Sequence, residues 1–186
     1  MRFTLVLGLA VLSMSSAGRA ADAEHRHHGP HVHGEATLNI GLDGQMLLIG
    51  LEAPGMSLLG FERPPRDDAE RALYDHVLDV LHRPDSWLTL PPAAACALDS
   101  ADVTANGFRA HGAAADDQEH DAHHEHADFD VTYRFSCHVP LAVRTIDVTL
   151  IDQFPSLHKI NVDLVLSDRQ GSQVLLPGSK TVSLSR

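Results

Sequence analysis

Alternating apolar and polar positions predict β-strands along most of the chain. The first two runs, residues 36–40 and 46–52, flank Asp43-Gly44, a dipeptide typical of tight β-hairpins. Pro54-Gly55 ends the second run. Further strand patterns lie at residues 87–90, 95–105, 129–137, 143–151, 160–166, 174–176 and 182–184. Gly171 and Gly178 are expected to mark turns between the last of these strands.

Residues 67–82 carry helical periodicity instead. Asp67 or Asp68 can cap the start of this helix, and Arg83-Pro84 ends it. Its apolar residues recur every three or four positions and form one stripe, which we expect to pack on the sheet: Ala69, Leu73, Val77, Val80 and Leu81. The pattern predicts an α+β or mainly β fold, a largely antiparallel sheet with one main helix packed on it.

The N-terminus has the plan of a secretory signal peptide. A basic start is followed by a short apolar run and then by small residues, which suit cleavage after residue 20 or after residue 23. The apolar run is shorter than the roughly 20 residues that a membrane span needs. We therefore expect export to the periplasm, with no membrane insertion once residues 1–20 are removed.

The remaining chain divides into a tail and one domain. Residues 24–33 form a polar, histidine-rich tail, and residues 34–186 suit a single globular domain. Residues 107–127 interrupt the strand patterns with alanine, aspartate and histidine, so we expect a flexible histidine-rich insert there. The net charge of −11 argues against binding to nucleic acid.

The two cysteines, Cys96 and Cys137, allow two structural interpretations. An oxidising compartment favours a disulfide between them. In the rival interpretation, both thiolates bind zinc beside His138. Export makes the disulfide the favoured interpretation, because free thiolates are hard to keep reduced outside the cytoplasm.

Histidine is the unusual residue, with 14 in 186 positions. Two clusters hold most of them: His25, His27, His28, His31 and His33 in the tail, and His120, His123, His124 and His126 in the insert. Neutral imidazole is a common ligand of Zn²⁺, and Ni²⁺ and Cu²⁺ also bind it. The clusters therefore predict a metal site, with zinc as the leading ion.

Spacing within the clusters supports this prediction. His31 and His33 form an H-x-H pair at the start of a strand, where alternate residues face the same side. His124 and His126 form a second pair shortly before the strand at 129–137. If those two strands are neighbours in the sheet, the four imidazoles could surround one ion.

Other functions are also compatible with clustered histidines. A structural or interaction domain could use them to buffer metal or to sense pH between about 5 and 7. A zinc hydrolase is a weaker interpretation, because the chain has no H-E-x-x-H, G-x-S-x-G or phosphate-loop motif. We therefore expect a protein that is not an enzyme.

Several motifs, in order, resemble those of the ZrgA-type zinc-regulated periplasmic proteins. They are H-V-H-G-E-A-T-L-N-I at residues 31–40, L-L-G-F-E-R-P-P-R at 58–66, V-T-Y-R-F-S-C at 131–137 and F-P-S-L-H-K-I at 154–160. The resemblance implies a periplasmic protein that assists zinc uptake, beside an ABC importer and its own zinc-binding protein. It also implies zinc ligands among His31 and His33 and within residues 120–126.

Overall fold

The computed structural model describes residues 32–108 and 127–185. The predicted signal peptide and most of the histidine-rich tail and insert lie outside this part of the chain. The strands are β1 (Glu35–Asp43), β2 (Met46–Pro54), β3 (Leu88–Thr89), β4 (Cys96–Asn106), β5 (Asp128–Cys137), β6 (Thr145–Val148), β7 (Lys159–Leu166), β8 (Arg169–Leu175) and β9 (Thr181–Ser183). The helices are α1 (Gly55–Leu58), α2 (Asp68–His82) and α3 (Leu150–Gln153), with 3₁₀ turns η1 (Pro84–Ser86), η2 (Pro92–Ala94) and η3 (Pro140–Ala142).

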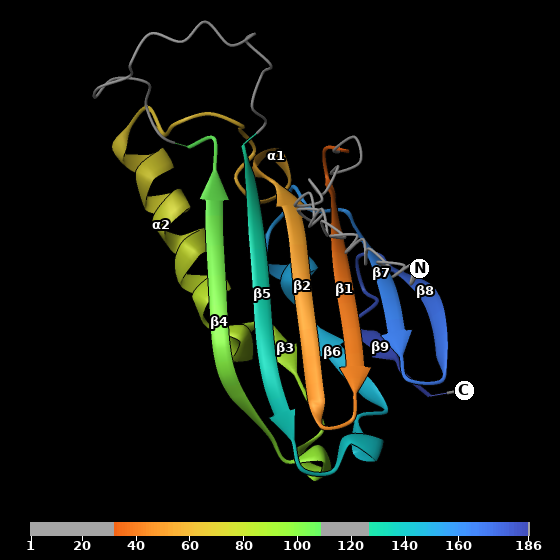
Figure 1. Cartoon of the computed structure of the whole chain (residues 1–186). Helices are drawn as coiled ribbons and strands as arrows, with labels where there is room; N and C mark the ends of the chain where they lie inside the picture. Colours follow the sequence, from red (N-terminus) through yellow and green to blue (C-terminus); the bar gives the residue numbers. More distant parts are fainter. Residues whose placement is uncertain (1–31, 109–126, 186) are drawn as a thin grey trace, which may run out of the picture.

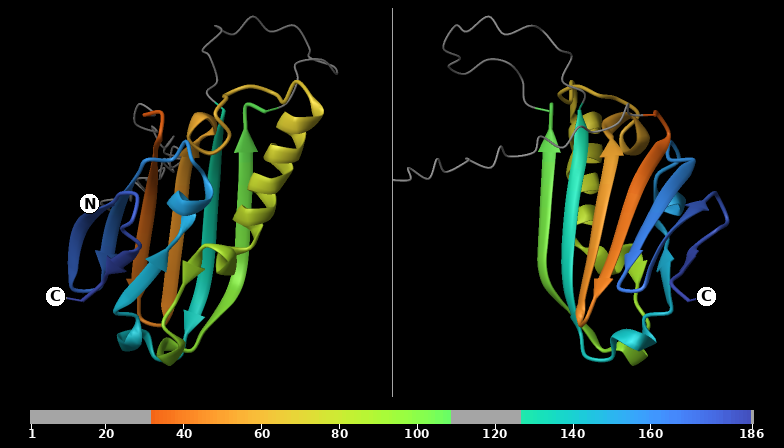
Figure 2. Two further views of the ribbon diagram at one scale, coloured as in Figure 1. Left: turned by 180° about the vertical axis from the view of Figure 1, so that it is seen from behind. Right: turned by 45° about the vertical axis from the view of Figure 1, so that its right-hand side comes forward.

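Two sheets and α2 build the domain (Figure 1). The larger sheet has six strands in the order β4-β5-β2-β1-β7-β8, and the smaller one has three in the order β3-β6-β9. In Figure 2, α2 and the small sheet cover the same face of the large sheet. The chain is therefore mostly β with few helices among the described residues, as the strand patterns predict.

The large sheet is mixed rather than uniformly antiparallel. Strands β1 and β7 run parallel, with Glu35 opposite Lys159 and Leu42 opposite Leu166. The other neighbouring pairs in this sheet are antiparallel. A parallel pair requires a long crossover connection, and here the chain forms the small sheet's strands β3 and β6 between β1 and β7.

The first two strands form the predicted hairpin. Strand β1 pairs with β2 in antiparallel register, ending at Asp43 opposite Met46. Gly44 in the turn has φ +55°, a left-handed conformation that glycine adopts without steric cost. The Asp-Gly prediction is confirmed.

Helix α2 begins as predicted, but its apolar stripe is only partly buried. The Asp67 side chain caps the helix by accepting a 2.8 Å hydrogen bond from the Glu70 amide. Val77, Val80 and Leu81 are buried, whereas Ala69 and Leu73 are exposed. The expectation that all five residues pack on the sheet is wrong for the N-terminal half. There Tyr74 makes the contact instead, with its ring centroid 5.2 Å from that of Phe108 and 6.0 Å from that of Phe129 of β5.

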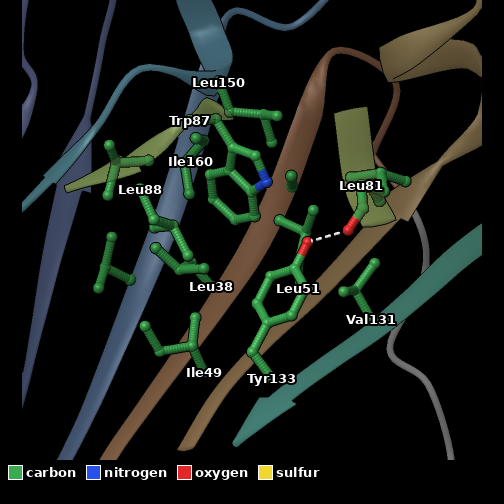
Figure 3. Packing of buried hydrophobic residues seen from close by; sticks show 14 of the residues in the cluster. Leu38, Ile49, Leu51, Leu81, Trp87, Leu88, Val131, Tyr133, Leu150 and Ile160 are labelled. Atoms are coloured by element: carbon green, nitrogen blue, oxygen red, sulfur yellow. Dashed lines mark hydrogen bonds between the residues drawn. The ribbon is translucent and has the colours of Figure 1, made fainter. Parts of the chain in front are cut away.

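The core lies between the large sheet and the elements that cover it (Figure 3). Leu38, Ile49 and Ile160 point from the large sheet towards Trp87, and all four are buried. The Tyr133 hydroxyl donates a hydrogen bond to the Leu81 carbonyl oxygen and so ties β5 to the end of α2. Burial raises the pKa of this hydroxyl, which keeps it protonated as a donor.

Two local predictions are wrong. The alternation at 143–151 predicts one strand, but β6 ends at Val148 and Leu150–Gln153 forms α3. Leu150 and Ile151 remain buried in α3, so apolar residues next to each other suit a helical turn there. Gly171 lies inside β8 opposite Leu164 rather than in a turn.

Cys96 and Cys137 form a disulfide, with an S–S distance of 2.05 Å. They lie opposite each other at one end of the β4–β5 ladder. The rival interpretation, a thiolate zinc site beside His138, is therefore wrong.

None of the helices in the described part of the chain is long and apolar enough to cross a membrane.

Candidate metal site at one end of the large sheet

Both histidine-rich segments join the folded domain at the same end of the large sheet. Strands β1, β5 and β7 begin at this end, and β2 and β4 finish there (Figure 1). The tail enters through Val32, three residues before β1 begins, and the insert is bounded by Phe108 and Ala127. Opposite Asp128 lie Pro54 on one side and Asn106 on the other. The fold therefore gathers the attachment points that the sequence separates.

Strands β1 and β5 are not neighbours, however. Strand β2 lies between them, which separates their axes by about 10 Å, twice the usual strand spacing. A single site built from the two H-x-H pairs must therefore span the end of β2. Direct adjacency of the two strands, the simplest geometry for a shared site, does not occur.

The bases of the insert pack tightly against the end of β2. Phe108 and Ala127 are buried, although both fall within the predicted insert 107–127. The Gly55 amide donates a 2.7 Å hydrogen bond to the Ala127 carbonyl oxygen. A side chain at Gly55 would come within 2.8 Å of the Phe108 ring and 2.9 Å of that same oxygen. The fixed part of the domain therefore extends to the residue next to His126.

His33 is the one predicted metal ligand that lies in the described part of the chain. Its Nε2 atom is 3.3 Å from Oε1 of Glu62, and the side chains are 58% and 14% exposed. The imidazole thus faces solvent while the carboxylate is largely withdrawn from it. A histidine nitrogen beside a carboxylate oxygen is a donor pair that suits zinc.

The backbone directly after His33 is held firmly. Gly34 has φ +80°, and its amide donates a 3.1 Å hydrogen bond to the buried Ser57 hydroxyl. The Gly34 carbonyl oxygen accepts hydrogen bonds from the amides of His158 at 2.8 Å and Lys159 at 3.2 Å. These contacts tie the entry of β1 to α1 and to β7.

Glu62 is held by the residues that flank it. Phe61 is buried, and the Arg63 guanidinium lies 4.8 Å from the Phe61 ring centroid. Arg63 also donates two hydrogen bonds to the Glu70 carboxylate, at 2.6 and 2.7 Å. These bonds, together with one from the Arg66 amide, lower the pKa of Glu70 to about 2, and Glu70 in turn raises the pKa of Arg63.

A second carboxylate at this end, Glu35, is already engaged. It accepts 2.9 Å hydrogen bonds from Lys159 and from Asn161. These two bonds, that of Lys159 first, lower the pKa of Glu35. Glu35 therefore fastens β1 to β7 and is ionised at neutral pH.

The other predicted ligands are not placed. His25, His27, His28, His31, His120, His123, His124 and His126 lie outside the described residues. Within residues 32–108 and 127–185, no three His, Cys, Asp or Glu side chains are grouped so as to hold a metal ion. The described part of the chain contributes the pair His33 and Glu62.

The sequence patterns do not identify two residues at this end of the large sheet, Glu62 and His158. Glu62 sits in the L-L-G-F-E-R-P-P-R motif and His158 in F-P-S-L-H-K-I, but neither belongs to a histidine cluster. His158 packs beside Gly34, where an added Cβ would lie 3.0 Å from its Cδ2 atom. Their nearness to His33 results from strand pairing and turns, which spacing along the chain does not reveal.

Comparison with known proteins adds one match. The family described as ZrgA family zinc uptake protein matches residues 30–184, which include every element of the fold. No curated protein matches the chain.

Proposed function

Because the chain belongs to the ZrgA family of zinc uptake proteins, we propose that it is a periplasmic protein that captures Zn²⁺ through its two histidine-rich segments. Residues 1–20 serve as the export signal in this proposal. The chain acts by binding and transferring the ion rather than by catalysis. The ligands are drawn from the tail and insert histidines, with Ni²⁺ and Cu²⁺ as competing ions.

The observation that carries the proposal is the common origin of the two segments. His31 is two residues from His33, and His126 is bonded to Ala127, whose carbonyl oxygen accepts the Gly55 hydrogen bond. Both attachment points lie at the end of the sheet where β1 and β5 begin (Figure 2). The two segments therefore join the domain at the same end of the sheet, as the proposed capture of one ion by both requires.

The number of histidines suits capture followed by release. A tetrahedral zinc ion needs about four protein ligands, and the two clusters supply nine. Alternative ligand sets allow one imidazole to replace another without full dissociation of the ion. Such exchange would let the protein pass zinc to the periplasmic binding protein of an ABC importer.

Zinc titration calorimetry at pH 7.5 and pH 5 tests capture by histidine. Binding should be weaker at pH 5, because protonated imidazoles cannot ligate the ion. Replacing His120, His123, His124 and His126 by Asn should reduce both affinity and stoichiometry. Replacing the exposed α2 residues His76 and His82 by Asn is the matched control and should change neither.

Equal zinc affinity at the two pH values would contradict histidine ligation. The alternative function, an interaction domain that senses pH, can be distinguished from zinc capture by measuring how the chain binds a partner protein. Capture of an importer's zinc-binding protein by the immobilised chain should depend on Zn²⁺ under the proposed function. Partner capture that follows pH and ignores zinc would favour the sensor instead.

A further inference from the structure

We propose that Glu62 is a zinc ligand and that its Oε1 atom binds the ion beside Nε2 of His33. This inference rests on the proposed zinc function and adds an oxygen ligand to a set otherwise predicted from histidines alone. Its basis is the placement of two side chains that are far apart in the sequence and 3.3 Å apart in the fold.

The separation of the two atoms suits a shared ion. Zinc binds nitrogen and carboxylate oxygen at about 2.0–2.2 Å, so a tetrahedral angle puts two such ligands roughly 3.3 Å apart. A charge-assisted hydrogen bond from nitrogen to a carboxylate is shorter, usually about 2.7–2.9 Å. The observed 3.3 Å between Nε2 and Oε1 therefore matches two ligands of one ion better than a direct hydrogen bond.

Both ligands are presented by fixed backbone, which limits the entropy that binding costs. His33 precedes Gly34, whose amide and carbonyl groups are both hydrogen-bonded. Glu62 stands between buried Phe61 and Arg63, which is anchored on Glu70. Neither backbone needs to rearrange when the ion arrives.

The exposure of the pair gives the ion a way in. The His33 side chain is 58% exposed, and that of Glu62 only 14%. A largely buried carboxylate loses hydration, and an adjacent cation offsets that loss. The Oε1 atom of Glu62 is itself buried, so the ion reaches it from the side of the exposed His33 ring.

Other carboxylates at this end have different positions. Glu35 is held by Lys159 and Asn161, and Glu70 by Arg63 and Arg66. Of these three carboxylates, Glu62 is the one placed against a histidine.

Site-resolved NMR during a zinc titration tests the inference on the exported chain, residues 21–186. Amide signals of Gly34 and Arg63 should shift as Zn²⁺ is added. In Glu62→Gln, which preserves side-chain size, the zinc concentration needed for these shifts should rise at least about tenfold. Asp43→Asn removes a carboxylate from the hairpin at the opposite end of β1 and should leave the titration unchanged.

Glu62→Asp provides a second measurement that retains the carboxylate but shortens its reach. Its affinity at these amides should fall between those of the native chain and Glu62→Gln. If zinc binds the chain while the Gly34 and Arg63 shifts are absent or unaffected by Glu62→Gln, the ligand assignment is wrong and capture by histidines stands. If calorimetry detects no zinc binding by the native chain, the proposed function fails and the ligand assignment fails with it.

Discussion

The amide of Gly34 and the hydroxyl of Ser57 are joined by a 3.1 Å hydrogen bond between the start of β1 and α1. The same hydroxyl donates a 2.8 Å hydrogen bond to the Glu35 carbonyl oxygen. Among the described residues, Ser57 is the one buried residue that is neither apolar nor aromatic. Ser57 thus helps to fix the backbone beside His33, together with the amides of His158 and Lys159 that bond the Gly34 carbonyl oxygen.

Replacing Ser57 by Ala should lower the free energy of unfolding by about 1–3 kcal/mol. The Gly34 amide and the Glu35 carbonyl would each lose a buried partner, and such groups are costly to leave unsatisfied. Urea denaturation measures the change. Ser100→Ala, which removes an exposed hydroxyl bonded to Asp102, is the control and should change the unfolding free energy by less than about 0.5 kcal/mol. Equal effects of the two variants would contradict the structural role of Ser57.

Replacing Gly34 by Ala should destabilise the protein more than replacing Gly44 by Ala. Both glycines have positive φ, +80° and +55°, so each substitution costs about 1–2 kcal/mol of backbone strain. At Gly34 the new Cβ would also lie 3.0 Å from Cδ2 of His158, whereas nothing lies within 4 Å at Gly44. Thermal unfolding of the two variants measures the difference, and a greater loss in Gly44→Ala would contradict the predicted steric contact.

The local pattern of apolar and polar residues was sufficient to predict those strands and helices whose stabilising contacts are close in the sequence. The hairpin of β1 and β2 follows from alternation and the Asp43-Gly44 turn, and α2 follows from its cap at Asp67 and its periodicity. Periodicity identifies the apolar face of a helix but not how many of its turns are covered. That is why Leu73 was predicted to be buried and is exposed.

Long-range pairing could not be predicted in the same way. Alternation shows that β1 and β7 are strands, but it carries no information that they run parallel to each other. The contacts within the candidate site could not be predicted from the sequence for the same reason. Histidine spacing predicted His33, whereas the contact with Glu62 depends on a hairpin, the short helix α1 and a turn at Gly60 with φ +81°.

Removing the disulfide with the double variant Cys96→Ser and Cys137→Ser should lower the unfolding free energy by up to about 4 kcal/mol. The link closes a loop with a sequence separation of 41, and the chain-entropy model assigns roughly that value to such a loop. Urea denaturation without reductant measures it. Reduction of the native protein by dithiothreitol should give a similar loss, while the double variant should not respond to reductant. A double variant as stable as the native protein would contradict the prediction.

Acid should weaken the fold partly through Glu70. Hydrogen bonds from Arg63 and the Arg66 amide lower the pKa of Glu70 from its ordinary value of 4.5 to about 2. A carboxylate whose pKa is lower in the folded state stabilises the protein above its unfolded pKa, and this stabilisation is lost as pH falls from about 4.5 towards 2. Glu70→Gln should therefore be less stable than the native protein at pH 7, and the difference should shrink towards pH 2. Asp68→Asn, at the exposed first turn of α2, is the control, and urea midpoints across this pH range make the comparison. A difference in stability between the native protein and Glu70→Gln that stays constant with pH would mean that Glu70 does not act through its charge.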